Sequence, residues 1–96
     1  MNTEKYILLS TYTRYSKIES AFVQELFEHD LIVPKTKDNE VFIDENDIVI
    51  IERLFRLHRD LGINFEGLCT VNDMLARIQR LEAKMNQLQQ RLNLYE

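Results

Sequence analysis

The hydrophobic positions in the last quarter of the chain follow a heptad pattern. From Val71 onward, apolar residues recur at alternating intervals of three and four, with no Gly or Pro between them. The series comprises Val71, Met74, Ile78, Leu81, Met85, Leu88, Leu92 and Tyr95. An unbroken series of this kind is typical of the a and d positions of a coiled coil. The pattern predicts one long helix over 71–95, about 37 Å in length at 1.5 Å per residue.

A narrow apolar stripe of this length cannot fold back fully onto so small a protein. We therefore expect it to pair with a second copy of the chain, although a helix packed partly on its own head is the alternative. Arg77, Lys84 and Arg91 occupy g positions, where they would oppose each other in an antiparallel pair. In a parallel pair, Arg77 would face Glu82 of the partner subunit. Exposed pairs contribute well under about 1 kcal/mol, so these charges do not decide the orientation.

Apolar residues with helical spacing also organise the chain before the heptads. They predict three shorter helices, over 11–15, 19–28 and 45–61. Ser10 and Asp44 can act as N-caps of the first and the third. Gly62 suits a left-handed helix end, and Asn64 can cap a further short helix that contains Cys69.

Two short apolar runs, 6–9 and 41–43, lie between these helices. They are predicted to pair as a small two-stranded sheet, which needs the helices as a platform because such a sheet is not stable alone. Pro34 blocks helix continuation, and the following residues to Glu40 are predicted to form a polar turn. The fold class is therefore mainly α, with a head over 1–70 and a dimerising helix over 71–96.

The charge of the chain is unevenly distributed. Among its 96 residues, 16 Asp and Glu and 12 Lys and Arg give a net charge of −4, which argues against binding nucleic acid or anionic membranes through total charge. Residues 6–61 carry eleven acids against seven bases, whereas 62–96 carry four of each. Residues 18–34 contain no Lys or Arg and four acids: Glu19, Glu25, Glu28 and Asp30.

The residues needed for catalysis or metal binding do not occur in a recognisable pattern. Cys69 is the only cysteine, which excludes an intrachain disulfide and a multi-cysteine zinc site. His29 and His58 are far apart in sequence, and no metal or phosphate-binding motif is present. We predict no enzyme activity, no cofactor and no metal, with His58 at the edge of the core. No apolar run can span a bilayer and the start does not resemble a signal peptide, so a cytoplasmic location is expected.

A few short stretches of sequence define the order of the predicted elements. These are Tyr6-Ile7-Leu8, Leu31-Ile32-Val33-Pro34, Val41-Phe42-Ile43 followed by Asp47-Ile48, and the spaced series Leu54, Leu57, Leu61, Gly62. This order resembles the MerR-type winged helix-turn-helix architecture. The length, the acidity and the terminal coiled-coil helix resemble its chaperone-modulator (CbpM-type) branch. The resemblance implies a regulator that binds the J-domain of a DnaJ-like co-chaperone and inhibits its work with Hsp70.

The second helix departs from the pattern of the DNA-binding members of that superfamily, which typically carry Arg there and in the wing. Here Gln24, Glu25 and Glu28 would face the groove, so the electrostatic attraction to phosphates and the Arg contacts to guanine are missing. Lys35 and Lys37 keep the wing slightly basic. A MerR-type DNA-binding transcriptional regulator therefore stays as the alternative, beside a homodimeric adaptor for some other partner.

An acidic helix suits a basic protein partner, and J-domains as a family present a positively charged helix to Hsp70. The predicted partner-binding residues on and after the second helix are Gln24, Glu25, Glu28, His29 and Asp30. Each could instead belong to a solvated helix face. Arg53 and Arg59 are predicted to be left free if Arg56 pairs with Glu52 and Asp60. They form a second candidate contact, to an acidic group of the same partner, or else a solvated mixed face.

Overall fold

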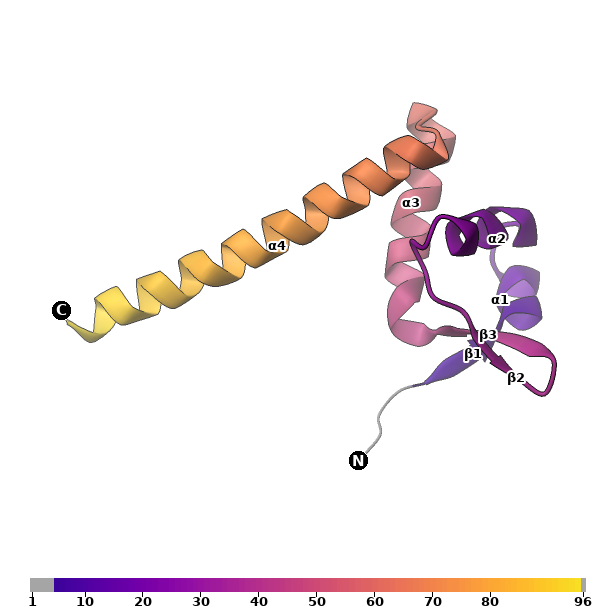
Figure 1. The fold of residues 1–96 in the computed structure, drawn as a ribbon, viewed down its shortest axis with the longest axis horizontal. Helices are drawn as coiled ribbons and strands as arrows, with labels where there is room; N and C mark the ends of the chain where they lie inside the picture. The colour runs from indigo at the N-terminus through magenta and orange to yellow at the C-terminus, as the bar shows by residue number, and fades with distance from the viewer. Residues whose placement is uncertain (1–4, 96) are drawn as a thin grey trace.

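The computed structural model describes residues 5–95, which form a small head and a long projecting helix (Figure 1). The elements follow in the order β1 (Tyr6–Leu8), α1 (Leu9–Tyr15), α2 (Ser20–Glu28), β2 (Lys35–Lys37), β3 (Glu40–Asp44), α3 (Ile48–Leu61) and α4 (Phe65–Leu94), with a 3-10 turn at Glu45–Asp47. The predicted mainly helical fold with a long C-terminal helix is confirmed. The molecule measures 55 × 39 × 21 Å because α4 extends far beyond the head.

The sheet has three antiparallel strands in the order β1-β3-β2, so the prediction of two strands was wrong. Phe42 of β3 lies opposite Leu8 on one side and opposite Lys35 on the other. The segment predicted as a polar turn thus contains a strand and a two-residue hairpin turn. Asp38 and Asn39 both have positive φ, 53° and 64°, as the type I′ turn of a tight hairpin requires. Because β2 is exposed, it lacks the alternation of apolar and polar residues that would have identified it.

The helix boundaries agree with the predicted ones to within a few residues, apart from two local differences. α1 begins at Leu9, so Ser10 lies inside the first turn and is not the cap. Asp44 does cap, but its carboxylate accepts a hydrogen bond of 2.9 Å from the Asn46 amide in the 3-10 turn that precedes α3. At the other end of α3, Gly62 adopts φ 67°, the left-handed conformation predicted for it.

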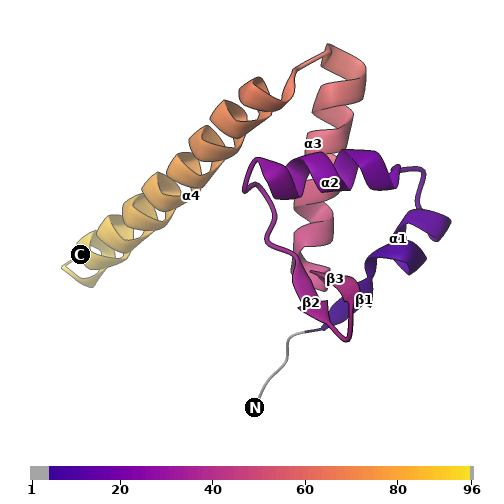
Figure 2. The same ribbon diagram turned by 45° about the vertical axis from the view of Figure 1, so that its right-hand side comes forward.

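The core lies where α2 crosses α3 above the sheet (Figure 2). Val23 and Leu26 of α2, Ile51 and Leu54 of α3 and Leu68 of α4 are fully shielded from solvent. Ile43 of the central strand is equally buried and connects the sheet to the helices. The remaining buried apolar residues around them are Leu9, Tyr12, Ile18, Phe22 and Ile32.

α4 is one continuous helix that begins at the head and leaves it at an angle to α3 in both views (Figures 1 and 2). The Asn64 side chain caps it by accepting a 2.8 Å hydrogen bond from the Gly67 amide. The separate short helix predicted after Asn64 is therefore the first part of α4, because no Gly or Pro follows Gly67 to end it. Beyond Ala76, every described residue of α4 is exposed. The predicted boundary at 70/71 falls inside this helix, and the division into two units stays a prediction.

Candidate functional site

The exposed face of α2 carries the predicted partner-binding residues. Gln24, Glu25 and Glu28 follow helical spacing on one side of α2, opposite the buried Val23 and Leu26. Asp30 is exposed immediately after the helix. We call Gln24, Glu25, Glu28 and Asp30 the acidic surface. The structure therefore places Gln24, Glu25 and Glu28 along one side of α2, with Asp30 two residues after the helix ends.

The end of α2 is built in a way that costs stability. Asp30 adopts φ 57°, and the Leu31 amide donates back to the Leu26 carbonyl at 2.9 Å, which closes a Schellman-type helix end. Glycine is the usual residue at such a left-handed position, because it has no Cβ to clash. The last turn of α2 contains no basic residue, so its acids lie at the negative end of the helix dipole. Local stability therefore does not explain why acidic residues stand here.

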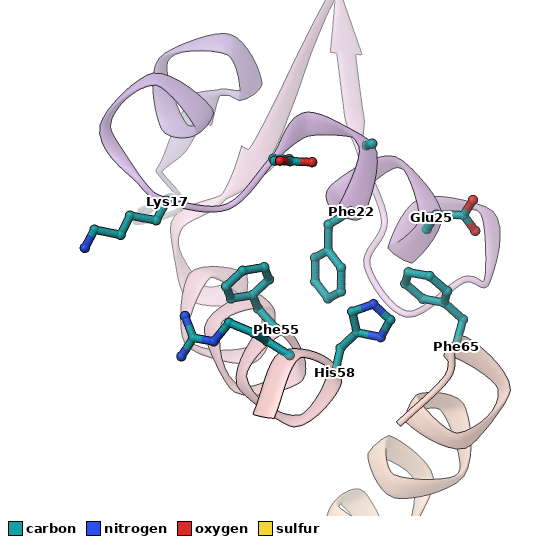
Figure 3. A pocket seen from close by; sticks show the side chains of 9 residues that line it. Lys17, Phe22, Glu25, Phe55, His58 and Phe65 are labelled. Carbon is teal, nitrogen blue, oxygen red and sulfur yellow. The ribbon is translucent and has the colours of Figure 1, made fainter. Parts of the chain in front are cut away.

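A hollow of about 530 Å³ adjoins the acidic surface, between α2, α3 and the start of α4. Its aromatic wall consists of Phe22, Phe55, His58 and Phe65, whose rings gather in Figure 3. The Phe22 ring meets Phe55 edge to face at 5.2 Å and lies 5.6 Å from Phe65. The polar residues of the rim are Lys17, Glu19, Glu25 and Arg59. This volume is in the range of pockets that accept a small molecule or a partner side chain.

Both histidines hold the first turn of α4 in place. His58 donates a 2.7 Å hydrogen bond from Nδ1 to the Ile63 carbonyl and stacks on Phe65. His29 donates from Nδ1 to the Glu25 carbonyl at 2.9 Å and stacks on Phe65 as well. His58 thus packs at the edge of the core, as predicted. His29 was predicted as a partner contact, but it is half-buried and already engaged within the head.

The arginines of α3 do not form the pattern that was predicted. Arg59, expected to be free, donates from Nε to the Asp60 carboxylate at 2.9 Å, and this bond lowers the pKa of Asp60. The reason is that the neighbouring carboxylate is within reach of Arg59 at the exposed end of the helix. Arg53 lies elsewhere, beside Arg56 and Asp60 in a different hollow. Arg59 therefore lies on the rim of the hollow that Glu25 also lines, whereas Arg53 does not.

The heptad positions of α4 lie in solvent. Met74, Ile78, Leu81, Met85, Leu88 and Leu92 are each between 46% and 67% exposed, and Tyr95 is 89% exposed. Val71 alone among the eight is half-buried, because it lies where α4 still contacts the head. A continuous apolar stripe of this length is unusual on a monomeric protein.

Chemical groups suited to catalysis are not assembled in the part of the chain that the structure describes. No three side chains among His, Cys, Asp and Glu of residues 5–95 are placed to hold a metal ion. Cys69 is half-buried, with Sγ 4.0 Å from the His29 carbonyl. None of the described helices combines the length and the apolar character needed to cross a membrane.

Sequence reasoning missed the aromatic wall of the hollow. Phe22, Phe55 and Phe65 come from three helices, and each one alone has the spacing of an ordinary core residue. Lys17 and Glu19, which complete the rim, precede α2, and their spacing indicates a helix start and not a binding site. Only the crossing of α2 over α3 brings these residues together.

Comparison with known proteins agrees with the fold. Residues 7–90 match the sequence model of the family described as MerR HTH family regulatory protein. The chain is 26% identical over 85 residues to the chaperone modulatory protein CbpM of Pseudomonas entomophila, covering 88% of this chain and 84% of the relative. CbpM proteins of two Pseudomonas putida strains match over the same shares, at 26% and 25% identity. These likenesses confirm the resemblance predicted from the sequence. The chain belongs to the MerR helix-turn-helix family of regulatory proteins.

Proposed function

We propose that this protein is a non-enzymatic chaperone modulator that binds the J-domain of a DnaJ-like co-chaperone and inhibits its work with Hsp70. The observation that carries the proposal is the acidic surface on the helix that would read DNA in a DNA-binding relative of this fold. Its relatives at 25–26% identity are named chaperone modulatory proteins, which supports a role in chaperone regulation. Their names do not identify the J-domain, which is our inference from the charge of the surface.

The mechanism that we propose is occlusion. Acids that cost stability at the end of α2 are favourable where a basic helix approaches them, because the two opposite charges then compensate each other. Covering the basic helix of a J-domain would prevent Hsp70 from reaching it. Long-range attraction would speed the encounter and weaken with added salt. Arg59 is not part of this proposal, because its guanidinium group already forms an ion pair with Asp60.

The proposal is tested by titrating the protein with a J-domain from the same organism and, in parallel, with mixed-sequence duplex DNA. We expect micromolar or tighter J-domain binding, and loss of J-domain-stimulated Hsp70 ATPase activity in its presence. The double variant Glu25→Lys with Glu28→Lys should bind at least tenfold more weakly. Glu52→Lys with Asp73→Lys is the matched control, since it changes the net charge equally at exposed sites outside the acidic surface.

Three results would contradict the proposal in whole or in part. Salt-sensitive binding to DNA without a J-domain signal would favour the transcriptional regulator, acting through Lys35 and Lys37 of β2. If neither the J-domain nor DNA bound, the remaining hypothesis would be a homodimeric adaptor for some other partner. Equal losses in the two double variants would mean that net charge, and not the acidic surface, determines the affinity.

We also propose that α4 pairs with α4 of a second copy through the exposed heptad residues. The part of α4 that is fully exposed extends about 27 Å at 1.5 Å per residue, which is long enough for a short coiled coil. Leu81→Asp with Leu88→Asp should give a monomer by sedimentation equilibrium, whereas the wild type should have twice the chain mass. Gln79→Asp with Gln87→Asp adds the same charge outside the stripe and should leave the dimer intact. A wild-type monomer would contradict the pairing.

A further inference from the structure

We infer that the hollow between α2, α3 and α4 receives an arginine side chain of the protein partner. The aromatic wall would hold the flat guanidinium group, and the carboxylate of Glu25 would pair with it. This inference rests on the proposed function, because it takes the partner to have a basic surface. It adds the place where one of the partner's cations is bound and the residues that bind it.

The hollow has the shape and the lining that a guanidinium group requires. Four aromatic rings supply its wall, and Phe55, His58 and Phe65 are only half-buried, so ring surface remains accessible from solvent. Aromatic faces attract cations through the negative charge of their π-systems. A planar guanidinium can stack on such a face while its edge donates hydrogen bonds to a carboxylate.

The chain itself demonstrates that this wall accepts a guanidinium group. Arg59 lies with its Cζ 5.2 Å above the centre of the Phe55 ring. It does so from the rim of the hollow, while its Nε remains bonded to Asp60. A partner arginine would make the same kind of contact with the part of the wall that remains open to solvent, where Phe55, His58 and Phe65 are half-buried. The contact between Arg59 and Phe55 is therefore a model within the chain for the contact that we propose with the partner arginine.

The charges around the hollow favour a cation. Of its two basic residues, Arg59 is paired with Asp60, and the Lys17 side chain points away from the rings in Figure 3. Glu25 lies on the side opposite Lys17 in that view. Its carboxylate is 3.7 Å from the His29 ring and 44% of its side chain is exposed, so it remains accessible to a partner. Within residues 5–95, Glu19 makes no ion pair.

The first test probes the hollow without any protein partner. N-acetyl-arginine amide is titrated into the full-length protein, and the ring protons of Phe22, Phe55 and Phe65 are followed by NMR. N-acetyl-norleucine amide, a neutral apolar side chain, is the control ligand. We expect saturable shifts of these ring protons with the arginine compound only. Equal responses to both compounds, or none, would overturn the inference.

Substitutions in the wall and on the acidic surface locate the binding. Phe55→Leu keeps an apolar side chain but removes the aromatic face, and should weaken the arginine response about threefold to tenfold. Phe65→Leu provides a second variant should Phe55→Leu fold poorly. Glu28→Gln removes an acid outside the hollow and should leave the ring-proton shifts in place. The inference would be overturned if the ring-proton shifts were lost in Glu28→Gln but retained in Phe55→Leu and Phe65→Leu.

The second test uses the J-domain and a matched pair of charge variants. Arg59→Gln and Arg56→Gln each remove one positive charge from α3, but only Arg59 lies at the hollow. Arg59→Gln frees the face of Phe55 and should strengthen binding about threefold. Arg56→Gln should change it less than twofold at physiological salt, where charges more than about 8 Å apart are largely screened. Equal gains for both variants would overturn the inference.

The two tests separate the inference from the function on which it rests. Arginine-specific shifts without J-domain binding would support the hollow as a cation site and contradict the J-domain as the partner. J-domain binding that is insensitive to Phe55→Leu would support the proposed function and contradict the role of the hollow.

Discussion

Replacing Asp30 by glycine should make the protein more stable and weaken its binding to a basic partner. Asp30 has φ 57° and closes the end of α2, where the Leu31 amide reaches back to the Leu26 carbonyl. Its side chain is exposed, and its charge stands at the negative end of the helix dipole. The same residue therefore opposes stability and belongs to the surface proposed to bind the partner.

Three contributions set the size of the expected change in the free energy of unfolding. Relief of the left-handed backbone should add about 1 kcal/mol, since Asp tolerates this conformation better than most residues. Removal of the charge at the helix end should add about 0.3–1 kcal/mol. The greater freedom of glycine in the unfolded chain should subtract about 0.5 kcal/mol. The sum is about 1 kcal/mol, which in a domain of this size raises Tm by about 4–8 °C.

Asp30→Asn separates the two favourable contributions, because Asn also tolerates positive φ but carries no charge. It should gain only the dipole contribution, about 0.5 kcal/mol. Both variants are compared with the wild type by calorimetry at one protein concentration, since pairing of the chains makes Tm depend on concentration. Both should bind the J-domain more weakly despite their higher Tm. If Asp30→Gly were less stable than the wild type, the reasoning about the helix end would be refuted.

The remaining predictions concern the interior of the head and the start of α4. Tyr12→Phe should be at least as stable as the wild type at pH 7, since the buried Tyr12 hydroxyl lies near the Ser16 side chain but makes no hydrogen bond of good geometry within the described chain. Burial raises the pKa of Tyr12, so the wild type should lose stability as the pH rises above about 10, where the unfolded phenol ionises. Urea unfolding at pH 7 and pH 11 should therefore show that the stability difference in favour of the variant widens with pH. A difference that narrows with pH would contradict this prediction. Gly67→Ala should lower Tm despite a helix-propensity gain of about 1 kcal/mol, because its Cβ would lie 2.7 Å from Cγ2 of Ile63; a higher Tm would mean that Ile63 repacks. Leu26→Ala should cost about 2–5 kcal/mol in urea unfolding, since Leu26 is fully buried; a loss below about 1 kcal/mol would mean that the core closes around the missing side chain.

Features that depend on neighbours in the sequence were predicted well. Gly62 ends α3 in the left-handed conformation and Asn64 caps α4, because both effects act within a few residues. The heptad series and the acid-rich α2 are likewise local patterns, and the structure places both on exposed helix faces.

Features that depend on distant residues were not predicted. β2 exists because β3 supplies its hydrogen-bond partners, and its own residues, Lys35 to Lys37, have no apolar pattern to reveal it. One local pairing was missed as well: helical spacing suggested other partners for the charges of α3, yet Arg59 pairs with Asp60, the next residue in the chain.

The sequence by itself determined the family, the end of α3 at Gly62, the start of α4 at Asn64 and the sign of charge on α2, because periodicity, capping and composition act locally. Only the tertiary structure decided that α2 crosses α3 and that Phe22, Phe55 and Phe65 meet beside the acidic surface. The crossing results from burying the apolar faces of separate helices in one core. A local pattern indicates that such a face exists, but it does not specify which other face will cover it.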